Sequence, residues 1–362
     1  MVLLAQGFNS YFMIREEGTQ VGVENTSWGA DSGLFSTGLY FNKESMSPAN
    51  EQAFLAEIGR SGVQDRGVKR HRQMGIKAKG SVEFNVYPEG GGDKAGVGLL
   101  MKHAFGAVTS GTYSGATDYL HQFIPHDNLY GNLASGTGLS NGTGRVFGLS
   151  FHIGREDDAG TIRDYPFLGN RIKTIAFSCA AGEELKCTVN TVARIGKAHG
   201  IAIPVSYPTM SPFMWKDAIF QIGVNEAGIG GIEQKIDNFI IQLGNNLKES
   251  WVLGTNVLGR VVPNGQRSIL GIYSTPFSGW VRSEYDKWVA GTPSSINMTF
   301  VSDIYRLEFR CPNIYYTGKA PNIGSLDEQV IEMPFQALVG THIFDMKSFL
   351  VNTDSSIGFC LN

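Results

Sequence analysis

The sequence predicts a mainly β protein built from two related antiparallel β-sandwich or barrel units, each with one short helix. Residues 79–106 hold a glycine, an alternating strand, a proline and a short amphipathic helix that ends in glycine, and residues 270–291 repeat this order. Alternating runs of apolar and polar residues, typical of half-buried strands, lie between glycine-rich stretches. Because two copies of one pattern indicate a duplicated structural unit, we expect units at 1–196 and 197–362.

The strands and turns follow from this alternation. Period-2 patterns predict half-buried strands at 145–153, 172–179, 237–243, 296–301 and 304–311. Glycine and asparagine pairs predict hairpin turns at Ala181–Gly182, Gly244–Asn246 and Asn264–Gly265. Three prolines in Lys197–Pro212 indicate a crossover between the two units.

Few helices are expected. Residues 97–105 predict one, and residues 283–291 predict a second, with a capping box between Ser283 and Asp286 at its start and Gly291 at its end. Residues 47–59 fit either a capped helix that starts at Ser47–Pro48 or an extended segment.

The composition fits a globular protein that associates with itself. The chain has 362 residues, of which 42% are hydrophobic and only 17% charged, and its formal net charge is −3. This length is enough for two cores. A low charge content is expected where a protein buries its surface against its own copies, and equally in a glycine-rich β protein with uncharged loops. No overall basic field is present to hold nucleic-acid phosphates.

The sequence also bears on location. Met1–Gly7 has no basic residue and too short an apolar run for a signal peptide, and no stretch approaches the ~18 apolar residues of a membrane span. We therefore expect a protein that is made and kept in the cytoplasm, without membrane association. Cys179 and Cys187 flank a turn and could form a disulfide, although buried free thiols are expected in a reducing compartment.

No motif for catalysis is found. Gly111–Gly115 carries its serine one place too late for a nucleophile elbow, and neither Gly196–Lys197 nor Gly318–Lys319 has the context of a phosphate loop. The glycines of 142–148 precede a strand instead of following one, which argues against a dinucleotide site.

Two acidic or histidine-containing clusters leave alternatives open. His121 and His126, near Asp118 and Asp127, could form a metal or acid–base site, but a polar loop is the favoured interpretation. Glu156–Asp158 could hold paired carboxylates or calcium ligands, but a solvated turn is favoured. The prediction is therefore a protein that is not an enzyme, with no catalytic, cofactor or metal site.

A basic cluster is the clearest candidate for contact with a partner. Within the segment Gly59–Lys79, residues 66–79 carry a cluster of seven basic residues, namely Arg66, Lys69, Arg70, His71, Arg72, Lys77 and Lys79. It has no interleaved aromatic residues, which a single-stranded nucleic-acid site would need. We predict a long basic hairpin loop that contacts an acidic surface of a neighbouring copy. A solvated loop is the alternative.

Several segments resemble the tail tube proteins of long-tailed bacteriophages. The resemblance covers most of the chain and is carried by Gly22–Gly29, Tyr40–Met46, Arg70–Gly80, Lys79–Tyr87 and Leu99–Gly106, and in the second half by Ile236–Leu247, Leu253–Gly254 and Gly265–Gly271. The family has a strand where residues 47–59 lie. Two loops, 131–144 and 159–167, have no counterpart in the family pattern.

The resemblance implies a structural protein of the virion tail, assembled in the host cytoplasm. Its sheet would join neighbours into rings, and the rings would stack into a tube that contacts other tail proteins and passes DNA without sequence-specific binding. Two units per chain imply a three-chain ring with pseudo-sixfold symmetry, and the loop 59–79 would reach the next ring.

Two other functions remain open. One is the tube of a secretion or injection machine. The other is a β-sandwich module that binds or hydrolyses carbohydrate. Its aromatic platform would come from Trp28, Trp215, Trp251, Trp280 and Trp288.

Overall fold

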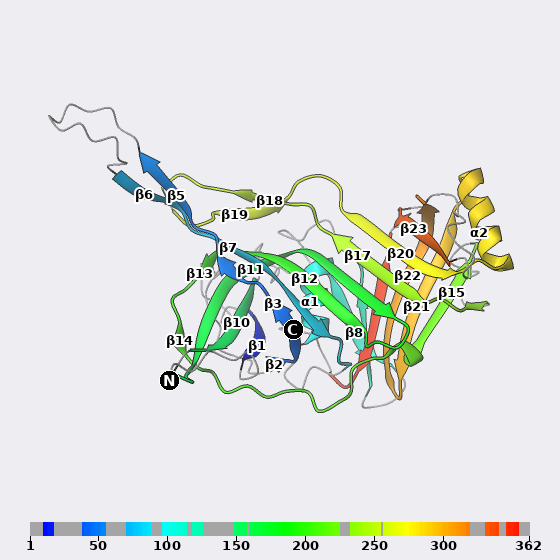
Figure 1. Ribbon diagram of the computed structural model, residues 1–362, viewed down its shortest axis with the longest axis horizontal. Coiled ribbons are helices and arrows are strands. Elements are labelled where there is room, and N and C mark those ends of the chain that lie inside the picture. Colours follow the sequence, from blue (N-terminus) through cyan, green and yellow to red (C-terminus); the bar gives the residue numbers. More distant parts are fainter. Residues whose placement is uncertain are drawn as a thin grey trace.

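The fold is mainly β, and every pair of strands is antiparallel, as the sequence predicts (Figure 1). The computed structural model describes residues 10–17, 38–55, 70–88, 96–113, 118–125, 148–157, 159–224, 232–254, 256–318, 330–339 and 345–354. None of the helices in these ranges is long and apolar enough to cross a membrane.

Two large layers form the sandwich. Sheet I consists, in spatial order, of β3 (Phe41–Glu44) with β4 (Ser47–Pro48), β7 (Ala78–Asn85), β12 (Lys186–Ala193), the second half of β11 (Ile162–Ala180), β17 (Asn238–Gly244), β20 (Ser268–Pro276) and β23 (Val330–Ala337). Sheet II consists of β16 (Glu233–Gln234), β15 (Ala218–Gly223), β21 (Ser294–Ser302), β22 (Tyr305–Tyr316), β24 (Lys347–Asn352), β9 (Tyr119–Phe123) and β8 (Val108–Thr112). The end of β22 also pairs with β23, which connects the two sheets.

The core lies between these sheets. Alternate residues of each strand point inward, so aromatic side chains from the two sheets meet. Phe177 of β11 lies 4.6 Å from Phe309 of β22, and Phe220 of β15 lies 6.0 Å from Phe239 of β17, measured between ring centroids. Both pairs join the two sheets, and the first also joins the two halves of the chain, so that one core results.

A third, smaller sheet shares a strand with sheet I. It contains β1 (Tyr11–Glu16), β2 (Gly38–Leu39), β10 (Leu149–Glu156), the first half of β11, β13 (Ile195–Gly196) and β14 (Gly200–Ile201). β11 changes sheets near Gly169, which has a φ of 68°. The buried Asn170 donates from Nδ2 to the carbonyls of Leu149 and Phe167, which satisfies backbone groups at this bend. The expected loop at 159–167 is wrong, because most of it belongs to β11.

The helices confirm one prediction and correct another. α1 (Val97–Phe105) has the predicted bounds, is buried throughout, and ends at Gly106 in the left-handed conformation. α2 (Gly279–Ala290) ends at Gly291 as predicted but begins four residues earlier than expected. The predicted capping box at Ser283 is therefore wrong. Val281 is buried in the core, and because of this burial the turn before Ser283 is also helical.

Residues 47–55 are extended, as β4 and β5 (Glu51–Leu55), so the helical alternative is wrong for this part of 47–59. β5 pairs with β6 (Arg70–Gly75) in a hairpin that projects from the body (Figure 1). We call the β5–β6 hairpin the arm. A second hairpin, β18 (Leu247–Ser250) with β19 (Arg260–Pro263), lies beside its base.

Two predicted hairpin turns are wrong. Gly244–Asn246 leads from β17 into β18, and Asn264–Gly265 leads from β19 to β20, whereas the paired strands are β17 with β20 and β18 with β19. The two linkers instead bind each other, since the amide of Asn264 donates to the carbonyl of Asn246 and the Asn246 side chain donates back to the carbonyl of Asn264. The turn at Ala181–Gly182 between β11 and β12 is confirmed.

The same order of elements occurs in each half of the chain. A strand of sheet I, a protruding hairpin, a second strand of sheet I, a helix and a pair of strands of sheet II follow one another as β3, β5–β6, β7, α1 and β8–β9. They recur as β17, β18–β19, β20, α2 and β21–β22.

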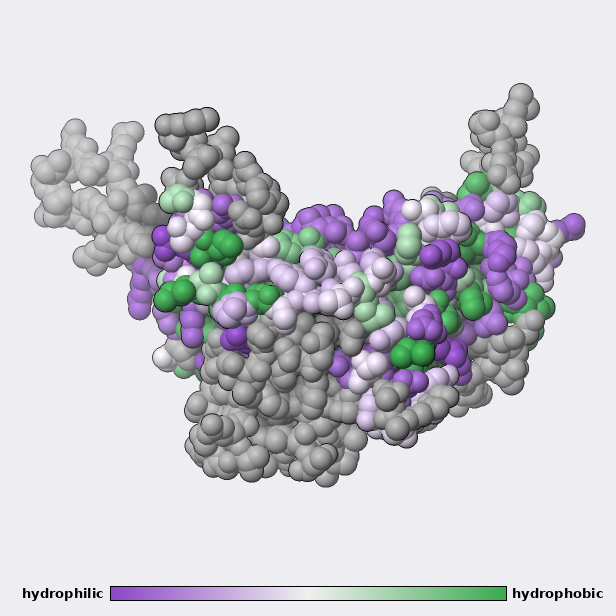
Figure 2. Space-filling model, turned by 90° about the horizontal axis from the view of Figure 1, so that it is seen from below, coloured by the Kyte–Doolittle hydropathy of each residue, from purple (hydrophilic) through white to green (hydrophobic). Residues whose placement is uncertain are grey.

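The crossover segment runs along the first half. The amides of Gly38 and Phe213 donate to the carbonyls of Ser206 and Val86. This stretch forms the lower edge of Figure 1. The view from below in Figure 2 shows near-neutral residues across the middle of the face, with hydrophilic and hydrophobic residues interspersed on both sides.

Candidate assembly interfaces

The predicted contact residues lie on or near the arm, but they do not share one environment. Arg66 and Lys69 lie outside the described residues. Arg70 begins β6, and Arg72 is exposed on the same strand. Lys77 lies at the base of the arm and is only half-exposed. The structure therefore separates Arg72, which is available to a partner, from Lys77, which is bound within the chain.

Lys77 connects the arm to the β18–β19 hairpin. Its Nζ lies 2.9 Å from Glu249 Oε2 and 3.1 Å from Glu51 Oε1, and 5.7 Å from the centre of the Trp251 ring. The hydrogen bond to Glu249 raises the pKa of Lys77, so the ammonium form is favoured. This side chain therefore holds two hairpins from different halves of the chain together.

Backbone contacts fix the same junction. The amide of Ile76 donates to the carbonyl of Asn256 at 2.7 Å, and the amide of Leu258 donates to the carbonyl of Ile76 at 3.1 Å. A Cβ on Gly75 would lie 2.5 Å from the Trp251 ring, so the close approach requires glycine. Beneath it, a small separate core unites Val192, Leu247, Leu258 and Val261. The β18–β19 hairpin is thus a support for the arm.

The turn of the β18–β19 hairpin exposes apolar side chains. Leu253 is fully exposed, while Trp251 and Val252 are 38% and 45% exposed. Met74 on the arm is also exposed. Apolar groups gathered on a protrusion are typical of a contact with another molecule.

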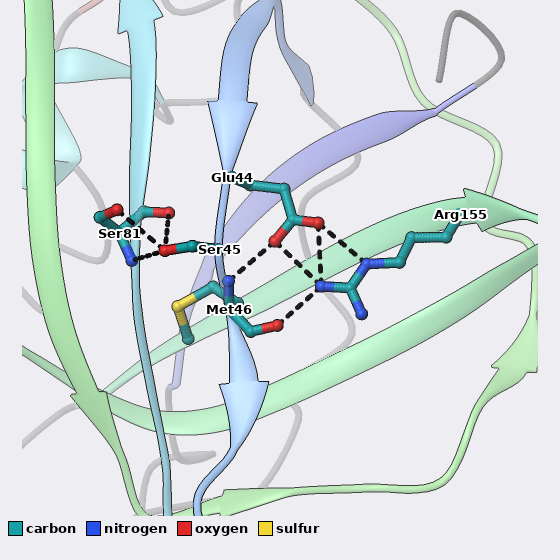
Figure 3. A network of polar contacts seen from close by, with 5 residues as sticks. All are labelled: Glu44, Ser45, Met46, Ser81 and Arg155. Carbon is teal, nitrogen blue, oxygen red and sulfur yellow. Dashed lines mark hydrogen bonds and ion pairs between the residues drawn. The ribbon is translucent and has the colours of Figure 1, made fainter. Parts of the chain in front are cut away.

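The β3–β4 edge of sheet I has no strand partner on its outer side among the described residues. A polar network interrupts this edge between the two strands (Figure 3). The Ser45 side chain takes the place of a backbone carbonyl in the pairing with β7, because its Oγ accepts from the amide of Ser81 at 3.0 Å. A Cβ on Gly80 would lie 2.6 Å from the backbone of Met46, so the edge approaches β7 closely here.

The outward backbone groups of Met46 are occupied within the chain. Its amide donates to Glu44 Oε2 at 2.8 Å, and its carbonyl accepts from Arg155 Nη2 at 2.7 Å (Figure 3). Arg155 and Glu44 also form a two-point ion pair with both contacts at 2.9 Å. A strand added to this edge could therefore bond to β3 but not to Met46.

The face of sheet I that points away from the core carries small and polar side chains. They include Ser81, Glu83, Ala176, Ser178, Thr188, Asn190, Gln242, Ser274 and Gln336. Apolar residues lie on this face as well, namely Ile240, Leu270, Ile272 and Pro334, of which Leu270 is 44% exposed. Its chemistry fits contact with water or with a passing polar molecule.

His121 lies in a buried polar contact on β9. Its Nε2 donates to Asn352 Oδ1 at 2.9 Å, and its Nδ1 accepts from Ser110 Oγ at 2.7 Å. Burial lowers its pKa, which favours the neutral ring. His126 and Asp127, which the sequence places near it, lie outside the described residues. The ring links strands β8, β9 and β24, a structural role.

The other candidate residues also have structural surroundings. Asp157 closes the β10–β11 turn, where it accepts from the amides of Ala159 and Thr161 and pairs with Arg163. Cys179 and Cys187 are free and buried. Trp215 and Trp251 are exposed at opposite ends of sheet I, so they do not form one aromatic platform.

Sequence reasoning missed the residues that organise these interfaces. Glu249 and Arg155 are ordinary charged residues in the sequence, and their partners lie 172 and 111 positions away. No local pattern marks such pairs. In the sequence, only Gly75 and Gly80 point to these contacts, because a glycine within a strand indicates that another segment approaches the backbone closely. They do not identify that segment.

Comparison with known proteins agrees with this geometry. A family model described as phage tail tube protein matches residues 7–337, nearly the whole chain. No curated protein matches the sequence.

Proposed function

Because the chain belongs to the phage tail tube protein family, a family of structural proteins of the virion tail, we propose that it forms rings that stack into a hollow tube for DNA ejection. The role is structural and non-catalytic. The observation that carries the proposal is the family match over residues 7–337, together with a broad sheet whose outer edge at β3 has no described partner.

Ring closure would use the ends of sheet I. An unpaired strand edge is a liability in a monomer and becomes an interface in a closed ring. β3 offers its outer backbone at one end of the sheet, and β23 borders the other end, where residues 335–337 already pair with β22 and residues 330–334 have no described strand partner on that side. The occupied Met46 would limit pairing to β3 and so help fix the register between neighbours.

Three chains would complete a ring. The repeated order of elements supports two related units, near 1–196 and 197–362, both of which contribute strands to sheet I. If one unit occupies one of six positions, a chain with two units needs three copies for closure.

The lumen would be lined by the outer face of sheet I. Its side chains include charges of both signs, such as Glu83 and Lys186, among neutral ones, and so offer no basic groove that would hold phosphates. DNA would therefore pass without sequence-specific binding. Assembly would take place in the host cytoplasm and would involve further tail proteins.

The arm would contact the adjacent ring through Arg66, Lys69, Arg70 and Arg72. Lys77 would not contact the adjacent ring itself and would instead hold the arm in place through its ion pairs with Glu51 and Glu249.

Electron microscopy and native mass measurement of the purified protein test this proposal. We expect rings of three chains and tubes built from them. A ring of six chains would reject the three-chain arrangement, and a protein that stays monomeric at high concentration would reject tube formation. A tube in a secretion or injection machine would give similar images, so the presence of the protein in purified virions decides between these two functions.

Substitution of Arg70 and Arg72 by glutamate tests the arm. Loss of one partner from a desolvated charged contact costs ~2–5 kcal/mol, which repeated along a filament prevents growth. We expect soluble, folded rings that no longer form tubes. Normal tubes from this double variant would mean that the arm is a solvated loop.

A further inference from the structure

The two ends of sheet I differ in structure. At one end, β7 begins at Ala78 and β20 at Ser268, and both hairpins protrude there. At the other end, β11 turns into β12 through residues 181–185, next to the start of β17 at Asn238. β7 has eight residues, so these ends are about 26 Å apart along the strands.

A small apolar cavity opens at the end with the β11–β12 turn. It has a volume of about 100 Å³ and is lined by Ala180, Ala181, Trp215, Ile236, Phe239 and Met298, among others. A dry cavity of roughly 150 Å³ holds a benzene-sized molecule, so this space fits one aliphatic side chain. We call this cavity the socket.

The rim of the socket is acidic. Three carboxylates lie on it or act on the lining thiol of Cys179, from Asp237, Glu183 and Asp217, against the amine of Lys186. Lys186 pairs with Glu183 at 2.7 Å, which leaves an excess of two negative charges. Burial raises the pKa of the Cys179 thiol to about 11, and the carboxylates of Glu183 and Asp217 add to this rise.

The end with the hairpins has the opposite charge. Cationic side chains described at this end include Arg72, Lys77, Lys79, Lys173 and Lys248, against the carboxylates of Glu51 and Glu249. Positive side chains therefore outnumber carboxylates among these residues. Leu253 projects from this end with its side chain fully in solvent.

We propose that the socket receives Leu253 from the β18–β19 hairpin of a second copy of this chain, in a head-to-tail contact between stacked rings. The inference rests on the proposed tube function and names the receiving surface, which that function leaves open. The occupant is a second copy because one end of the chain carries an apolar tip in a basic field, and the other end an apolar socket in an acidic one. A head-to-tail contact of this kind does not close on itself, so it repeats without limit.

Two variants remove one side of the contact each. Leu253→Asp places a charge on the tip, and Glu183→Lys with Asp237→Lys reverses the rim. Leu253 is fully exposed and the rim residues are at the surface, so folding is expected to be unchanged, as checked by circular dichroism and by the mass of the ring. We expect rings of normal mass, with a critical concentration for tube growth raised by roughly tenfold or more.

Mixing the two variants gives the sharpest test. Rings of the Leu253→Asp variant keep their sockets, and rings of the rim variant keep their tips. One ring of each kind can therefore join through a single interface, and the resulting double ring has no functional end left for growth. Long mixed tubes would overturn the head-to-tail contact. Matched controls are Val289→Asp and Asp286→Lys on the exposed side of α2, which contributes to neither surface.

The outcomes separate this inference from the function on which it rests. If the natural chain forms tubes and the tip and rim variants do so equally well, the socket contact is wrong and the tube function stands. If the natural chain forms no tubes under any condition, both are wrong.

Discussion

The two helices arise from the same sequence pattern and have opposite surroundings. All nine residues of α1 are buried, between β11 of sheet I and β9 of sheet II, where Phe105 lies 6.1 Å from Phe123. In α2 only Val281 and Glu284 are buried among twelve residues. The sequence pattern of a strand followed by an amphipathic segment and a glycine thus specifies a helix. Whether that helix is buried depends on which sheets enclose it.

Truncation of one side chain in each helix, buried in α1 and exposed in α2, should show the largest difference. Leu100→Ala in α1 removes a fully buried side chain and is expected to cost about 2–5 kcal/mol of unfolding free energy. Val289→Ala in α2 removes a side chain that is 67% exposed and should change it by less than about 0.5 kcal/mol. Urea unfolding measures both, and equal losses would mean that α2 is covered in solution.

The polar anchor of α2 should matter more than its exposed Val289. The buried carboxylate of Glu284 accepts from Ser294 at 2.8 Å and from Tyr316 at 2.8 Å, and pairs with Lys287 at 2.6 Å. Glu284→Ala leaves these groups unsatisfied and should cost about 1–3 kcal/mol. The same measurement on Asp286→Ala, which is exposed on the same helix, provides the control and should show almost no change. If the two substitutions lower the unfolding free energy equally, Glu284 does not anchor the helix.

The smallest effect concerns His121, beside the first helix. Burial lowers its pKa in the folded protein, so the unfolded chain binds a proton more readily. The contribution of His121 is therefore fully present above its ordinary pKa of about 6.5 and is lost as the pH falls below that value. We expect a decline in unfolding free energy between pH 7 and pH 5 that is smaller in His121→Gln. An identical pH dependence in both proteins would assign the decline to other groups.

The sequence predicted the structure correctly where the structure depends on neighbouring residues. Alternation identified β17, β21 and β22, and the glycine at the end of each helix was found because only glycine adopts the left-handed conformation at low cost. The start of α2 was missed because the burial of Val281, a tertiary contact, determines it. The turns at Gly244–Asn246 and Asn264–Gly265 were misread for a related reason, since asparagine and glycine favour a turn without specifying which strands pair.

The candidate interfaces were predicted in part. The basic segment 59–79 was identified from charge alone, and its described part forms the base of a protruding hairpin. Charge content did not reveal that Lys77 is bound to Glu249, or that an acidic socket lies at the far end of the sheet. Both depend on residues far apart in the chain.

By itself, the sequence determined a mainly β fold, because alternation and glycine placement act over a few residues and need no distant partner. The tertiary structure alone decided that β11 belongs to two sheets, that the halves share one core, and that the two hairpins support each other. The shared core and the mutual support of the hairpins depend on contacts between segments more than a hundred residues apart, such as Phe177 with Phe309 and Ile76 with Asn256, while the division of β11 depends on the bend near Gly169. Many strands of similar composition could form such pairs, and only packing of the whole chain selects among them.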